Sequence, residues 1–221
     1  MKSNEQKSIW FVEGKDKYYE HYRTDNNYTD LRNWADKAYQ ILSPYLDKNF
    51  LHELRNVDYF ARMWELEVAE NLYCTGLKMT QTNRKGFDFC IECSDGSKIW
   101  IEAVLARAAE ELKQIQRDAI ASDGKVYETP RDEIALRFST VIYAKANKIK
   151  EKYLDMVETG DKVLIAVSAF SPGAMRPDID IFITSILPIK HQVVHFTTDG
   201  KPLDKKTSLP THTQQDKIQK R

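Results

Sequence analysis

The sequence is poor in cysteine, and its charges cancel. Only three of its 221 residues are cysteines, and Lys plus Arg equal Asp plus Glu at 33 each. Three cysteines leave no even disulfide framework of the kind that holds small secreted domains, so a reducing compartment is expected. A net charge of zero argues against a protein that coats nucleic acid by bulk electrostatics. Any nucleic-acid function would therefore have to rest on a local site.

Long apolar runs are missing as well. No stretch approaches the roughly 18 apolar residues that span a bilayer, and the first six residues, MKSNEQ, lack the apolar segment of a signal peptide. We expect a cytoplasmic protein without membrane contact, although a signal read by a bacterial effector-secretion system would leave no such trace. Cys90 and Cys93 have CxxC spacing, but the lack of a second pair argues against zinc.

The remaining composition is typical of one domain with added helices. With 42% hydrophobic residues, the chain can bury a substantial core. Residues 1–57 are rich in aromatics and lack strand-like alternation, so we expect a helical N-terminal layer, with helices at about 16–24, 29–43 and 46–55. Residues 58–198 should form the core, and residues 199–221 have too little apolar surface to order.

A β-hairpin is predicted between residues 85 and 107, where apolar and polar residues alternate on both sides of Ser94-Asp95-Gly96. A two-residue loop would leave Asp88 and Glu102 on opposite faces, whereas a three-residue loop pairs them across the strands. The three-residue loop is preferred, because it also gathers the apolar side chains on one face. These side chains are Phe87, Phe89, Ile91, Ile99, Ile101 and Ala103.

Two carboxylates paired in this way have Cβ atoms about 5 Å apart. At that separation they repel each other, and at least one should bind a proton more readily than usual unless a cation lies between them. Oxygen ligands on rigid strands suit Mg²⁺, or Mn²⁺ in its place, which bind one or two carboxylates and keep several waters. The plainer alternative is a hairpin whose Asp88 and Glu102 merely face water.

A helix is expected from Asp58 to Tyr73, ended by Thr75-Gly76. Glu65 lies on its apolar, sheet-facing side, whereas Glu67 faces outward. A buried carboxylate without a partner is costly, so Glu65 should meet a metal, an arginine such as Arg62, or a water-filled cleft.

The order of these elements resembles the PD-(D/E)xK, or restriction-endonuclease-like, phosphodiesterase superfamily. The features that carry the resemblance are a helix with a central Glu, a Gly-Phe-Asp strand, a tight hairpin and a strand that ends in Ile-Glu-Ala-Val. In that family an Asp and a Glu bind Mg²⁺, a lysine two residues after the Glu assists the attacking water, and a helical Glu often completes the site. The resemblance covers about residues 58–169.

By this resemblance, the metal-binding and catalytic acids are Asp88, Glu102 and Glu65. Two positions depart from the family pattern. Gly86-Phe87 precede the Asp where a proline is usual, and Val104 stands at the lysine position.

A helix is expected from Leu105 to Ala121. A second long helix is expected from Asp132 to about Val157, with an apolar stripe that Lys145 interrupts. Lys145 is either a snorkelling side chain at the rim of a packed face or, as in some members of the superfamily, the catalytic lysine supplied from a helix. Arg137, one stripe over, and Arg107 are predicted to contact substrate phosphate.

Residues 162–169, KVLIAVSA, are typical of a strand covered on both faces. The long helix before them is a crossover, so this strand should run parallel to residues 98–104. Further strands are expected at 179–183 and 193–196. The expected fold is α/β, a central mixed sheet of about five strands flanked by helices, with the helical N-terminal layer.

These features predict a Mg²⁺-dependent nuclease that hydrolyses nucleic acid, with DNA preferred, through Asp88, Glu102, Glu65 and Lys145. The alternative is a catalytically inactive nuclease-fold domain that serves binding or assembly, which Val104 favours. No pattern in the sequence distinguishes DNA from RNA as substrate, or endonuclease from exonuclease cleavage. The target sequence and the oligomeric state, which could be a homodimer, are not specified either.

Overall fold

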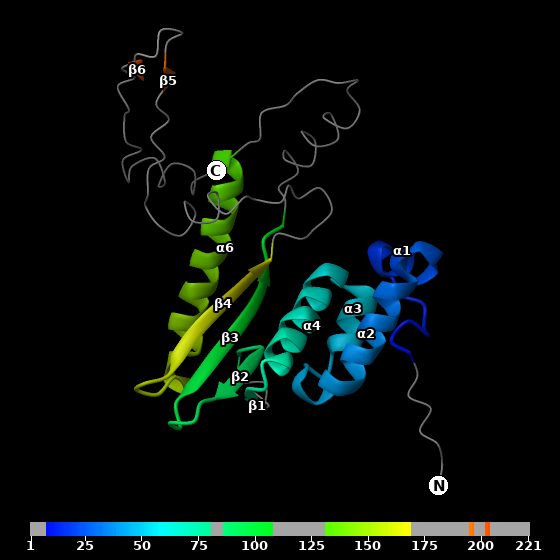
Figure 1. Cartoon of the computed structure of the whole chain (residues 1–221), viewed down its shortest axis with the longest axis horizontal. Coiled ribbons are helices and arrows are strands. Elements are labelled where there is room, and N and C mark those ends of the chain that lie inside the picture. The colour runs from blue at the N-terminus through cyan, green and yellow to red at the C-terminus, as the bar shows by residue number, and fades with distance from the viewer. Residues whose placement is uncertain (1–7, 81–85, 108–130, 169–194, 197–201, 204–221) are drawn as a thin grey trace. The chain divides into compact units, whose positions relative to one another are not determined.

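The computed structural model describes residues 8–80, 86–107, 131–168, 195–196 and 202–203. The chain divides into two compact units, residues 1–186 and 187–221. The first unit contains the helices and a four-stranded sheet (Figure 1). In the second, β5 (His195–Phe196) and β6 (Pro202–Leu203) pair antiparallel. The strand expected at 193–196 therefore pairs with part of the predicted tail and adds nothing to the four-stranded sheet.

The predicted N-terminal helices are confirmed as α1 (Lys17–Thr24), α2 (Thr29–Leu42) and α3 (Phe50–Asn56), with short 3₁₀ turns η1 (Asn26–Tyr28) and η2 (Ser43–Tyr45). Helix α1 begins where it does because the Asp16 carboxylate accepts the backbone N–H groups of Tyr18 and Tyr19. None of the described helices is both long and apolar enough to cross a membrane.

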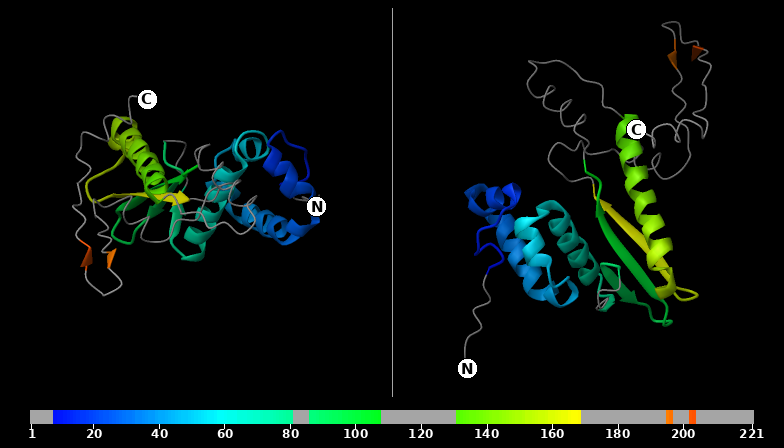
Figure 2. Two further views of the ribbon diagram at one scale, coloured as in Figure 1. Left: turned by 90° about the horizontal axis from the view of Figure 1, so that it is seen from above. Right: turned by 180° about the vertical axis from the view of Figure 1, so that it is seen from behind.

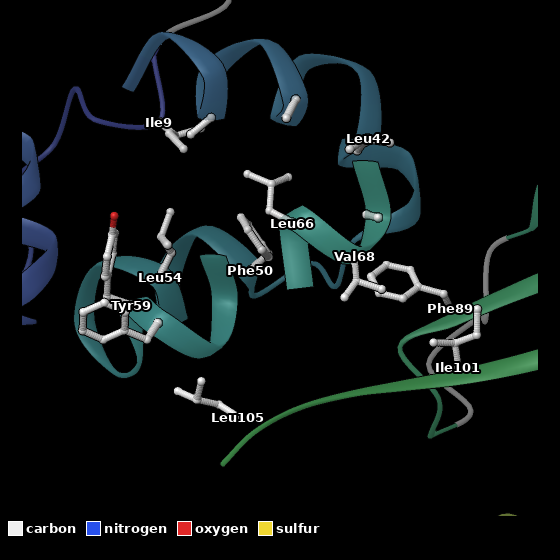
Figure 3. Close-up of a cluster of buried hydrophobic side chains, with 14 of the residues drawn as sticks. Ile9, Leu42, Phe50, Leu54, Tyr59, Leu66, Val68, Phe89, Ile101 and Leu105 are labelled. Atoms are coloured by element: carbon white, nitrogen blue, oxygen red, sulfur yellow. The ribbon is translucent and has the colours of Figure 1, made fainter. Parts of the chain in front are cut away.

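Helix α4 (Tyr59–Cys74) lies between the N-terminal helices and the sheet (Figures 1 and 2). The Asp58 carboxylate caps its first turn by accepting the Ala61 N–H. One continuous hydrophobic cluster joins the N-terminal helices, α4 and one face of the sheet (Figure 3). Its members include Ile9, Leu42, Phe50, Leu54, Tyr59, Leu66, Val68, Phe89, Ile101 and Leu105.

The sheet has the strand order β1 (Lys78–Thr80), β2 (Phe89–Glu92), β3 (Lys98–Leu105) and β4 (Lys162–Ser168). The first two pairings are antiparallel, and β3 pairs parallel with β4. Helix α6 (Arg131–Lys152) and the turn η3 (Leu154–Met156) make the crossover and cover the face opposite α4 (Figures 1 and 2). The predicted α/β class, mixed sheet and crossover are confirmed. Four strands of this sheet are described, and residues 179–183 lie outside the described part of the chain.

The predicted three-residue hairpin loop is confirmed. Phe89 pairs with Ile101, and Glu92 pairs with Lys98. The Cys93 N–H donates to the Ser97 carbonyl at 2.8 Å, which closes the loop. Gly96 has a φ of 85°, the left-handed conformation that this loop requires and that glycine adopts without strain.

The prediction that Phe87 shares a face with Phe89 is wrong. The Asp88 N–H donates to the carbonyl of Ile101, which is already the register partner of Phe89. Two successive residues thus face one partner, as in a β-bulge, and the alternation shifts by one residue. Asp88 therefore lies opposite Ile101 and is not paired with Glu102 as predicted. Phe87 therefore lies in a second cluster on the α6 side, with Cys90, Trp100 and Ile149.

Two further expectations need correction. Strand β4 was expected to be covered on both faces, but Leu164 is 51% exposed. Within the described residues β4 pairs only with β3. A helix was expected from Leu105, yet Leu105 ends β3 and Ala106 donates to the Ser168 carbonyl at 2.7 Å, which prolongs the strand pairing. Residues 108–121 lie outside the described residues.

Candidate active site

Glu102 lies on β3 and projects toward α6. Alternate residues of β3 point to opposite faces, and Trp100 of the same face packs with Ile149 of α6. The Glu102 carboxylate is buried, and its Oε1 atom contacts the Lys145 ammonium. Its Oε2 atom is buried and has no hydrogen-bond partner within the described structure. One oxygen of this carboxylate is therefore free to bind another group.

Helix α6 brings two lysines to this carboxylate. The Lys145 side chain is 26% exposed and contacts Glu102 directly, as an ion pair. Lys148, one turn further along the helix, places its Nζ 4.0 Å from the same Oε1 atom. Lys145 therefore points into the site and not to bulk solvent, as a catalytic lysine supplied from a helix must.

Asp88 lies just before β2, where the strand pairing ends. Its Oδ2 atom accepts the Ala103 N–H at 2.7 Å, so the carboxylate replaces the backbone acceptor that a longer β2 would have supplied. Burial, and after it the nearby Glu102 charge, raise the pKa of Asp88 to about 6, against the opposite effect of the bond from Ala103. The repulsion expected between the two carboxylates is therefore present.

Glu65 is buried on α4 and Glu67 is exposed, so the predicted orientation of this helix is confirmed. Glu65 forms an ion pair with Arg62, the partner foreseen as one of three possibilities. Burial raises the pKa of Glu65 to about 8, and the favourable charge of Arg62 does not offset this effect. Arg62 is shared with Glu53, whose Oε2 lies 3.4 Å from its Nε.

Electrostatic coupling connects Glu65 with Asp88. The charge of Asp88 helps to raise the pKa of Glu65, and the charge of Arg62 lowers the pKa of both acids. However, no group of three or more His, Cys, Asp or Glu side chains within the described residues is arranged to hold a metal ion. Glu65 therefore does not join Asp88 and Glu102 in one three-carboxylate cluster.

The other predicted residues are placed as follows. Arg107 pairs with Asp58 at the start of α4, and its side chain is 62% exposed. The three guanidinium nitrogens of Arg137 are buried without a hydrogen-bond partner in the described structure, and burial lowers the pKa of this side chain. Val104 is half-buried and shares the α6-facing side of β3 with Glu102. A lysine at position 104 would thus project to the face that Lys145 reaches from α6.

Sequence reasoning missed Lys148. The available signal was its spacing, because a residue three positions after Lys145 on a helix lies beside it.

Comparisons of the chain with protein-family models, with curated proteins and with solved structures found no match.

Proposed function

We propose that this protein is a divergent PD-(D/E)xK-like nuclease, a divalent-metal-dependent phosphodiesterase that acts on nucleic acid, with DNA as the preferred substrate. The finer fold assignment, a restriction-endonuclease-like sheet of about five strands, belongs to the same proposal. The resemblance of the helix, hairpin and strand motifs supports it. The observation that carries it is the contact between Glu102 of β3 and Lys145 of α6, beside Asp88.

The donor set fits a hard divalent cation. Asp88 and Glu102 offer carboxylate oxygens from a rigid sheet, and the buried Oε2 atom of Glu102 lacks a partner among the described residues. These two residues would hold Mg²⁺ or Mn²⁺. When bound, the cation would offset charge on the scissile phosphate and lower the pKa of an attacking water.

The protein's own residues then have distinct roles. Lys145 holds the Glu102 carboxylate in place, and its remaining donors stabilise negative charge that develops during cleavage. The Ala103 N–H orients Asp88 through its bond to Oδ2. Arg62 acts on Asp88 through its charge, from α4, and the charge of Asp88 in turn favours the protonated form of Glu65.

The second candidate is a catalytically inactive nuclease-fold module that binds nucleic acid or another partner. Val104 at the lysine position favours it, and so does a metal site with two carboxylates in place of three. This candidate predicts binding without cleavage.

The test is a titration of Mg²⁺ or Mn²⁺ into the purified full-length protein with labelled single- and double-stranded DNA and RNA. Cleavage should depend on the metal, stop with EDTA, and be lost in Asp88→Ala and Glu102→Gln. Glu158→Gln, which removes a carboxylate that is 77% exposed, should cleave normally. Metal-dependent binding without cleavage would support the inactive module, and cleavage that survives Asp88→Ala would exclude this site.

A further inference from the structure

The candidate site has an excess of cations around one carboxylate oxygen. Lys145 and Lys148 both approach Oε1 of Glu102, the first in contact and the second at 4.0 Å. Of the two ammonium groups, only that of Lys145 is in hydrogen-bond contact with this oxygen. An ammonium group has three donors, and the Lys148 side chain hydrogen-bonds to Tyr153, so Lys148 keeps a donor that a second anion would satisfy.

The two lysines differ in exposure. The Lys145 side chain is 26% exposed and the Lys148 side chain is 42% exposed. Lys145 therefore lies deeper, beside the buried carboxylate, and Lys148 lies nearer to solvent. A ligand that arrives from solution would meet Lys148 more easily.

The Lys148 ammonium is held in position by an aromatic ring. Its Nζ lies 5.2 Å from the centroid of the Tyr153 ring, within range of a cation–π interaction. The Tyr153 ring packs against Phe87, with centroids 5.6 Å apart. The same ring lies against Gly86, which has a φ of 105° and where a Cβ atom would collide with it. A flexible lysine is thus ordered before any ligand binds, which lowers the entropic cost of binding.

We infer that Lys148 is a substrate-binding residue, whose ammonium contacts a backbone phosphate beside the one attacked while Lys145 stays on Glu102. This inference rests on the proposed nuclease function. Two lysines and two carboxylates cancel in charge, so a bound divalent cation leaves the site positive and suited to a polyanion. Phosphate oxygens are strong acceptors for an ammonium group, and such contacts dominate affinity for nucleic acid.

The inference predicts different kinetic effects for the two lysines. Removal of a contact made equally in the ground and transition states raises KM and leaves kcat unchanged. Lys148→Met should therefore raise KM at least about tenfold, the lower end for a lost hydrogen bond to a charged group, and change kcat little. Lys145→Met should instead lower kcat.

The experiment measures KM and kcat of the full-length protein on a fluorescent oligodeoxynucleotide, in single-stranded and duplex form, at several salt concentrations. The variants are Lys148→Met, Lys148→Arg and Lys150→Met. Lys150 is an exposed lysine of α6, two residues away and so on another side of the helix. Lys150→Met removes the same charge outside the site and should behave like wild type, and Lys148→Arg should restore most of the affinity.

The salt dependence provides a second readout. Loss of one phosphate contact should make the slope of log affinity against log salt less steep by about 0.7 for a single strand and 0.9 for a duplex. Equal KM and slope for Lys148→Met and Lys150→Met would overturn the inference alone. A fall in kcat with unchanged KM would also overturn it, and a wild type that neither cleaves nor binds would overturn the proposed function as well.

Discussion

The two faces of the sheet are built differently. Along β2 and β3 the face toward α4 is apolar, and its residues Phe89, Ile101 and Leu105 belong to the main hydrophobic cluster. The face toward α6 is apolar only around Trp100 and turns polar at Glu102. Burial of apolar side chains stabilises the first face, whereas the second keeps a buried carboxylate that costs free energy of folding. Buried groups that cost stability are common at functional sites.

The two buried glutamates, Glu65 and Glu102, differ in where their ion-pair partners come from. Glu65 pairs with Arg62 three residues earlier on the same helix, so the pair can form wherever α4 forms. Glu102 pairs with Lys145 from a different element, 43 residues further along the chain. The second pair exists only when β3 and α6 are packed together, and it therefore reports on the tertiary structure of the site.

The largest expected effect breaks the apolar face. Phe89→Ala should lower the free energy of unfolding by about 3–5 kcal/mol, because Phe89 is fully buried in the main cluster. Cys90→Ala changes the next residue, which points to the α6 side, and should cost roughly 1 kcal/mol. Urea denaturation followed by circular dichroism measures both. Equal losses would show that the two faces contribute alike to stability.

A metal titration tests the polar face. Mn²⁺ or Mg²⁺ should raise the Tm of the wild type, by a stabilisation of about 2.7 kcal/mol at a hundredfold excess over Kd. Asp88→Asn should show no such shift. Since the pKa of Asp88 is raised to about 6, protons compete with the metal below that pH, and the Tm shift should shrink as the pH falls from 7 to 5. Equal shifts in both proteins at every pH would place the metal elsewhere.

The regular parts of both faces could be predicted from sequence. Period-two alternation and the Ser94-Asp95-Gly96 turn were enough to predict the hairpin register, and helical periodicity placed Glu65 inward on α4. The interruption at Lys145 predicted a lysine on the sheet-facing side of α6. These features depend on short-range geometry, which a sequence pattern records directly.

The irregular parts could not be predicted. Phe87 changed faces because Asp88 and Phe89 share one partner, and such a bulge leaves the alternation of residue types intact. The choice of Arg62 as partner of Glu65 was one of three open alternatives. The exposure of Leu164 depends on what lies beside β4, which the apolar run itself does not specify. Each of these depends on contacts between elements.

Lys145→Met separates catalysis from stability on the polar face. Cleavage should fall by roughly 100-fold or more, because the charge beside Glu102 is lost. The folded state should also lose stability, since among the described residues the buried carboxylate then keeps only Lys148, at 4.0 Å, as an ion-pair partner. The double variant Glu102→Gln with Lys145→Met should recover stability but not activity. If the double variant is no more stable than Lys145→Met, the two residues are not energetically coupled.

The smallest expected effect concerns Glu65 and depends on pH. Its folded-state pKa of about 8 lies above the ordinary value of 4.5, so the folded protein binds this proton more tightly than the unfolded chain. The free energy of unfolding should therefore fall as the pH rises from about 4.5 to about 8. Glu65→Gln removes this contribution, and it should be more stable than the wild type at pH 8.5, by at least about 1 kcal/mol, with a smaller advantage at pH 5.

Glu67→Gln is the matched control, because Glu67 is an exposed carboxylate on the same helix. Its difference from the wild type should stay within about 0.5 kcal/mol at both pH values. Urea denaturation at pH 5, 6.5 and 8.5 measures the free energy of unfolding of all three proteins. Subtracting the wild-type value from each variant's value at the same pH removes the contribution of every other titrating group. Parallel profiles for wild type and Glu65→Gln would mean that Arg62 keeps Glu65 ionised throughout. The cost of a buried carboxylate would then be confined to Glu102, on the face where α6 supplies the lysines.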